Sequence, residues 1–166
     1  MTKISTLATR PGRYEMRKVI YVLLLAGFVF STVGFSAEFK LYPGAKIDEK
    51  ATKKAMDGAV GAKTPDVKPA IYTTSDSFEK VASFYKGISK EYMMPRASGT
   101  SGKPKKREGY DLWEAYFIFD GAKDLSTSKL WIKVQRPYIG GVKMEGLQAK
   151  YEDVRDITAI VVSEKR

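Results

Sequence analysis

The side chains that could do chemistry in this chain of 166 residues are carboxylates, lysines, tyrosines and serines, because the sequence contains no histidine and no cysteine. Histidine is the usual general base near neutral pH and the commonest ligand of transition metals. Its absence excludes a Ser-His-Asp or Cys-His triad, and the missing cysteine excludes disulfides and thiolate zinc sites. We therefore expect no enzyme activity, no catalytic residue, no metal site and no cofactor.

Acidic residues of the C-terminal half are the remaining candidates for catalysis, because glycoside hydrolysis needs two carboxylates that face one cleft. These residues are Asp111, Glu114, Glu145, Glu152, Asp153 and Asp156. Nothing in the sequence brings any two of them together, and solvated surface charge is the simpler interpretation. A carboxylate-dependent hydrolase acting on cell-envelope glycan is therefore an alternative and not the main expectation.

The densest positive run in the chain is the segment 103–107, with the sequence KPKKR. Its basic residues are Lys103, Lys105, Lys106 and Arg107. Such a run attracts anionic lipid head groups, acidic polysaccharides or a polyanionic partner. A solvated loop tip without a ligand is the alternative that the sequence leaves open.

Four aromatic residues form a second candidate binding surface: Trp113, Tyr116, Trp131 and Tyr138. The first three lie in expected strands, where alternation directs some of them to a sheet face that a single helix would leave open. Exposed aromatic patches mark binding sites. Burial in the core, or cover by a helix expected at 49–60, is the alternative. Tyr138 stands beside two glycines and is either a binding residue or a loop anchor.

The elements that must position these residues are mostly strands. Short runs rich in β-branched and aromatic residues, bounded by turn residues, predict strands at 70–74, 112–119, 129–136 and 157–163. The third run alternates strictly between two sets of side chains, one on each face of a sheet. One set is Leu130, Ile132 and Val134, and the other is Trp131, Lys133 and Gln135.

Two helices are expected. The segment from Asp76 to Tyr92 has apolar residues at helical spacing, and Asp76 with Glu79 has the arrangement of a capping box. A shorter helix over 49–60, capped by Asp48, has only a thin apolar stripe and is expected at the surface.

This order of elements predicts an α+β domain. We expect a mainly antiparallel sheet of four to five strands, with the helix of residues 76–92 packed on one face and the helix of 49–60 as an addition. The domain spans residues 38–166 as a single unit. It includes a flexible basic loop at 96–109 and a glycine-containing connection at 138–151.

The first 37 residues have the pattern of a secretory signal peptide. A positive segment at 16–18 precedes an apolar run at 19–35, and the small residues Ser36 and Ala37 follow. We expect translation to start at Met16 and cleavage to follow either Ser36 or Ala37. Because the apolar run just reaches the lower limit of membrane-spanning length, an uncleaved inner-membrane anchor is the alternative.

Two stretches of the expected domain carry a family resemblance. The segments 41–45 (LYPGA) and 72–85 (YTTSDSFEKVASFY) resemble uncharacterised exported bacterial small-domain proteins with the pattern YPGA…TSDsfekVasFYk. The resemblance implies an exported bacterial address and a small α+β fold, and it brings no catalytic residues with it. The chain departs from the lipoprotein members of the group because it lacks the cysteine that lipidation needs.

Charge and address together lead to an expected function. Residues 38–166 carry 24 basic and 18 acidic residues, out of 29 and 19 in the whole chain. A modest positive charge favours anionic partners. We expect a periplasmic or secreted binding module for a protein partner or for an anionic or apolar ligand. Nucleic acid is not an expected partner, since exported proteins rarely meet it, and membrane contact is expected only through 19–35 if that segment is retained. A membrane-tethered structural protein is a further alternative.

Overall fold

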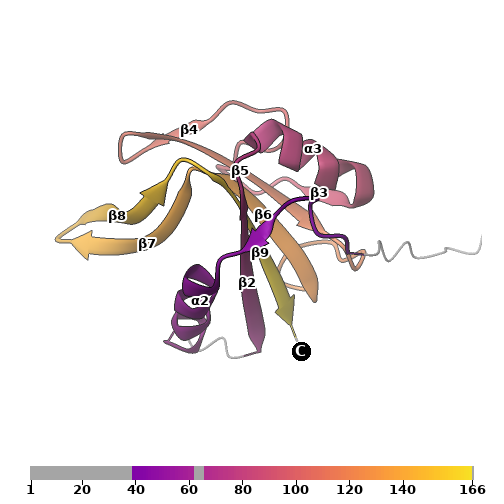
Figure 1. The fold of residues 1–166 in the computed structure, drawn as a ribbon, viewed down its shortest axis with the longest axis horizontal. Helices are drawn as coiled ribbons and strands as arrows, with labels where there is room; N and C mark the ends of the chain where they lie inside the picture. Colours follow the sequence, from indigo (N-terminus) through magenta and orange to yellow (C-terminus); the bar gives the residue numbers. More distant parts are fainter. Residues whose placement is uncertain (1–38, 62–65, 166) are drawn as a thin grey trace, which may run out of the picture. The chain divides into compact units, whose positions relative to one another are not determined.

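Figure 1 shows a computed structural model of the chain, which describes residues 39–61 and 66–165. The predicted targeting segment, residues 1–37, lies outside the described residues. Within the described ranges, none of the helices combines the length and the apolar character needed to cross a membrane.

The described residues form one seven-stranded sheet in which every neighbouring pair is antiparallel. Its strands lie in the order β1 (Lys46–Ile47), β2 (Val67–Thr74), β9 (Thr158–Lys165), β6 (Leu130–Arg136), β5 (Tyr110–Ile118) and β3 (Lys90–Tyr92), with β4 (Lys105–Arg107) also on β5. The α+β class is confirmed, and all four predicted strands are present. The expected number of four to five strands is wrong, because β1, β3 and β4 are only two or three residues long and give no periodic signal.

The principal helix, α3 (Phe78–Ile88), packs on one face of the sheet. The predicted alternation of β6 is confirmed on this face, where Ile132 and Val134 are fully buried. Together with residues of β5 and β9 they meet the apolar side of α3. The core so formed includes Phe78, Val81, Ala82, Tyr85, Ala115, Phe117, Ile132, Val134 and Ile160.

The start and the end of α3 differ from the prediction. The N-cap is Ser77, whose hydroxyl accepts a hydrogen bond from the backbone N–H of Lys80 at 3.3 Å, so the predicted capping box at Asp76 is wrong. Asp76 instead accepts a hydrogen bond from the Tyr42 hydroxyl at 2.7 Å. The helix ends at Ile88 because the following residues pair with β5 as strand β3.

The segment before β1, residues 39–45, contacts α3 through Tyr42. The Tyr42 backbone N–H donates to the Tyr85 hydroxyl at 3.1 Å, and its ring is buried. Gly44 has a φ of +80°, a conformation that side chains with a Cβ rarely adopt. Tyr42, Gly44 and Asp76, all within the segments that carry the resemblance, therefore have structural roles.

Helix α2 (Glu49–Gly61) packs on the opposite face of the sheet, against β2 and β9. The predicted helix and its cap are confirmed, since the Ala51 backbone N–H donates to Asp48 Oδ1 at 2.9 Å. The expectation of a surface helix needs correction, because Ala51 and Thr52 are buried and the Ile71 N–H donates to Thr52 Oγ1 at 2.9 Å. Because the buried residues of α2, Ala51 and Thr52, are small, the helix packs closely on the sheet without a strong apolar stripe.

Strands β7 (Tyr138–Glu145) and β8 (Gln148–Arg155) form a separate two-stranded antiparallel sheet, here called the arm. Figure 1 shows the arm extending away from the seven-stranded sheet. The predicted connection at 138–151 is therefore wrong. Its glycines and charged residues hide the strand pattern, because an arm that meets solvent needs no strict apolar alternation.

Candidate functional site

A groove lies between α2, the floor of the sheet and the arm. Its first part is a cavity of about 340 Å³, and its second part is a cavity of about 230 Å³. Lys133, Gln135 and Ile139 line both cavities, so the two parts adjoin. The apolar walls of the first part are formed by Ala51, Ala55, Ile71, Ile139 and Val161.

Lys133 stands on the floor of the groove. Alternation along β6 turns it away from α3, and only 26% of its side-chain surface is exposed. The Glu114 carboxylate on neighbouring β5 lies 3.8 Å from the lysine nitrogen, which is beyond normal hydrogen-bond length. Burial holds the pKa of Lys133 below its ordinary value, and the nearby Glu114 charge opposes this shift. The floor therefore carries a lysine whose charged form is poorly solvated.

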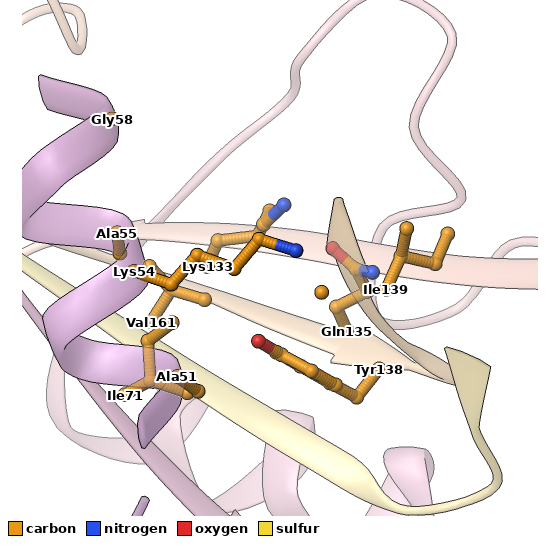
Figure 2. A pocket seen from close by; sticks show the side chains of 11 residues that line it. Ala51, Lys54, Ala55, Gly58, Ile71, Lys133, Gln135, Tyr138, Ile139 and Val161 are labelled. Atoms are coloured by element: carbon orange, nitrogen blue, oxygen red, sulfur yellow. The ribbon is translucent and has the colours of Figure 1, made fainter. Parts of the chain in front are cut away.

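Lys54 reaches the same cavity from α2. Its nitrogen lies close to the arm, 2.8 Å from the position that a Cβ on Gly141 would occupy. Glycine at this position therefore leaves room for the lysine. In the part of the chain that the structure describes, Lys54 makes no ion pair. In the view of Figure 2, the nitrogen ends of Lys54 and Lys133 both lie between α2 and the side chains of Gln135 and Ile139.

Tyr138 fixes the root of the arm beside the groove. It is only 4% exposed, and the Arg155 guanidinium lies 4.3 Å from its ring centroid. Arg155 in turn pairs with Asp48, just before α2, at 2.8 Å. Hydrogen bonds from the Ala51 N–H and from Arg155 hold the pKa of Asp48 below its ordinary value. Because this network joins the arm to the start of α2, the two sides of the groove are held together.

The second part of the groove lies under the arm. Arg107 of β4, Leu112 of β5, and Val142 and Tyr151 of the arm line it. The Tyr151 ring stacks on Tyr110 with centroids 6.3 Å apart. The loop predicted at 96–109 thus contains a strand, β4, that brings one basic side chain to the groove.

The groove brings together only two of the predicted site residues, Tyr138 and Arg107. Tyr116 and Trp131 lie on the same sheet face, with ring centroids 6.3 Å apart, and line neither cavity of the groove. Burial raises the pKa of Tyr116 above its ordinary value. Trp113 lies on the other face, 5.4 Å from Phe78 between ring centroids, so it belongs to the core.

The other three basic residues of the predicted site, Lys103, Lys105 and Lys106, are exposed and line neither part of the groove. Lys106 pairs with Asp111 at 3.1 Å. Only Arg107 of the KPKKR run thus lines the groove.

Sequence reasoning missed Lys54, Lys133 and Gln135 as site residues. The alternation of β6 already placed Lys133 and Gln135 on the face opposite the core. A lysine between Ile132 and Val134, in the middle of a predicted strand, is the available signal. This lysine does not predict a site by itself, because the face of the sheet that carries it becomes a groove only where the arm lies beside it.

The carboxylates of the described residues do not gather at the groove. Of the six acids considered from the sequence, Glu114 lines it and the other five line neither cavity. Over residues 39–61 and 66–165, no three acidic side chains come together as a metal site would need.

The comparisons with known proteins add no relative: no family model matches the chain, and no curated protein or solved structure matches it.

Proposed function

We propose that the chain is a non-catalytic binding module whose ligand lies in the groove between α2, the sheet and the arm. The observation that carries this proposal is Lys133, a lysine largely removed from water on the floor of a partly apolar groove. Desolvating an ammonium group lowers stability unless other groups compensate it. A ligand that fills the groove provides such compensation.

The composition of the groove favours binding over catalysis. Glu114 is the only carboxylate among the described residues that line it, whereas glycoside hydrolysis uses two. Burial raises the pKa of the Tyr138 phenol, so this group stays protonated near neutral pH and is not available as a base. The chain also contains no histidine to take that role.

An exported address is part of the proposal. It rests on residues 1–37, and it puts the domain in the periplasm or outside the cell. N-terminal sequencing of the native protein tests this address. A start at Ala37 or Glu38 supports cleavage and release, whereas an intact segment 19–35 supports the inner-membrane anchor.

The test of the groove needs a variant that fills it. Gly58 of α2 lines the first cavity, and a Cβ added there meets no atom within 4 Å. Gly58→Phe should therefore fill the groove without disturbing the backbone, and it also improves helix propensity. Gly87→Phe is the matched control, because Gly87 is a helical glycine of α3 with equal space and lies outside the groove.

The probe is the neutral fluorescent dye N-phenyl-1-naphthylamine. We expect saturable binding by the wild type and by Gly87→Phe, with affinity at least tenfold weaker for Gly58→Phe. Thermal unfolding checks that both variants are folded. Equal binding by Gly58→Phe, or no binding by the wild type, would contradict the proposed function.

A further inference from the structure

The charges that line the groove are unbalanced. Among its described lining residues, Lys54, Lys133 and Arg107 are cationic and Glu114 is the only anionic one. The two lysines lie in or beside the larger cavity, and the carboxylate lines only the smaller one. The larger cavity therefore has two ammonium groups and no carboxylate among its described lining residues. The Glu152 carboxylate of the arm lies outside this lining but near Lys54, 3.5 Å from the position of a Cβ on Gly141.

We infer that the groove binds a small organic anion with an apolar body, such as a medium-chain carboxylate. The anionic head lies between Lys133 and Lys54, and the apolar body lies against Ala55, Ile139 and Val161. This inference rests on the proposed function and adds the chemical class of the ligand to it.

The position of Lys133 favours an anionic head. Only 26% of its side-chain surface is exposed, and Glu114 at 3.8 Å is too far away for a normal hydrogen bond. A ligand carboxylate at hydrogen-bond distance replaces the lost water with a charge-assisted hydrogen bond, which is stronger than a neutral one. Lys54 gives the same carboxylate a second cation from the opposite wall.

The size and walls of the cavity favour a small molecule over a protein segment. Small-molecule pockets usually have volumes of about 300 to 1,000 Å³, with apolar walls and a few polar groups that set orientation. The larger cavity, at about 340 Å³, lies near the lower limit of that range. Its alanine, isoleucine and valine walls leave Gln135 and Tyr138 as the neutral polar groups.

Binding of an anion should be coupled to a proton. Burial lowers the pKa of Lys133, and an anion beside the nitrogen favours the charged form. Octanoate binding should therefore take up protons at pH values between the pKa of the free and of the bound state. Calorimetry in two buffers of different ionisation enthalpy measures this uptake.

The experiment compares four probes that differ in head and tail: octanoate, octanol, octyltrimethylammonium and acetate. Each probe is titrated by displacement of the neutral dye and by calorimetry. We expect octanoate to bind at least about tenfold more tightly than octanol, as one charge-assisted hydrogen bond is worth roughly that factor. Octyltrimethylammonium should bind more weakly than octanol, and acetate should not compete.

Variants of the two lysines then test whether the anionic head of the ligand binds between them. Lys133→Gln should abolish the preference for octanoate over octanol, whereas Lys133→Arg should retain it. Lys54→Gln should weaken octanoate binding several-fold. Lys50→Gln is the control, because Lys50 is an exposed residue of α2 outside the groove, and it should change binding less than twofold.

The outcomes separate this inference from the proposed function. If octanol displaces the dye as well as octanoate does, or if Lys133→Gln retains the preference, the anion site is wrong and the groove remains a binding site. If octanoate does not bind and the neutral dye does not bind either, both the inference and the proposed function are wrong.

Discussion

The two faces of the seven-stranded sheet differ in how completely they are covered. On the α3 face, Phe117, Ile132 and Val134 have no exposed surface. On the other face, α2 covers β2 and β9, and a groove remains over β6, lined also by residues 138–140 of the arm. Here the same strands present Glu114, Lys133 and Gln135.

This difference shows how one face of a sheet can stabilise the fold while the other face forms a groove. Alternation gives each strand an apolar side and a polar side, so residues one position apart belong to different environments. The α3 face buries apolar surface and supplies most of the hydrophobic stabilisation. The groove face retains polar groups at a cost in stability, and such groups are where ligands bind.

The largest expected effect is on the α3 face. Phe117→Ala should lower the free energy of unfolding by about 3 to 5 kcal/mol, because it opens a cavity in a packed core. Tyr116→Ala, one residue earlier on the other face, should cost less than half as much, because its ring is only partly buried. Urea unfolding measures both, and equal losses would contradict the difference between the faces.

The second largest effect should be a loss of folding stability at alkaline pH, caused by Tyr85 of α3. Burial raises the pKa of Tyr85 to about 12, from 10.0 in the unfolded chain. The folded state therefore keeps this proton longer, so its contribution is complete below pH 10 and is lost as the pH rises through 12. The loss amounts to about 1.4 kcal/mol per pH unit over that window.

Tyr85→Phe is the control for this pH effect. Phenylalanine does not titrate, so the variant should lack the part of the stability loss between pH 10 and 12 that comes from Tyr85. At neutral pH it should cost about 1 to 2 kcal/mol, because the Tyr42 N–H loses its acceptor. Unfolding curves from pH 9 to 12 measure both effects, and an unchanged alkaline slope in the variant would contradict the assignment.

A matched pair of valines compares the faces more finely. Val134→Ala, under α3, should cost about 2 kcal/mol, whereas Val161→Ala, on the groove wall, should cost about 1 kcal/mol or less. The same two methyl groups are removed in both variants. A larger loss for Val161→Ala would mean that the groove face is the better packed of the two.

The smallest effect should come from the ion pair in the groove. Replacing a buried pair by uncharged residues is often neutral or stabilising, so Lys133→Met with Glu114→Gln should change stability by about 1 kcal/mol, towards higher stability. In the wild type, the lowered pKa of Lys133 makes stability rise as pH increases from the folded-state pKa towards 10.5.

The double variant has no Lys133 to titrate, so this rise in the free energy of unfolding should be absent from it. Between pH 7 and 10, its stability should therefore increase less than that of the wild type. Denaturant unfolding at each pH measures it. An equally steep profile in the double variant and the wild type would show that the pKa of Lys133 is not lowered in the folded chain.

Regular periodicity made most of the sheet and both helices predictable from the sequence. The strict alternation at residues 129–136 placed Ile132 and Val134 in the core correctly. The sequence does not distinguish the cap of α3, because Asp76 and Ser77 are both good N-cap residues. In the fold, the Asp76 carboxylate accepts hydrogen bonds from the Tyr42 hydroxyl and the Lys80 ammonium, and Ser77 caps the helix.

The groove could not be predicted because it depends on the arm. Gly140 and Gly141 read as a loop, yet they permit close approach: a Cβ on Gly140 would lie 2.6 Å from an Asp153 oxygen. With residues 138–151 predicted as a connection, no element is expected opposite Lys133. The aromatic candidates are separated for a related reason, since alternation divides Trp113 and Tyr116 between the two faces, and only Tyr138 of the four lines the groove.

The central claim is that the groove, and not the α3 face, binds the ligand. Titration of the isotope-labelled protein with octanoate, followed by amide chemical shifts, tests it most directly. The account predicts saturable shifts at Ala55, Lys133 and Gly141, with none at Ala82 or Phe117. Shifts centred on α3, or shifts spread over the whole surface without saturation, would contradict it.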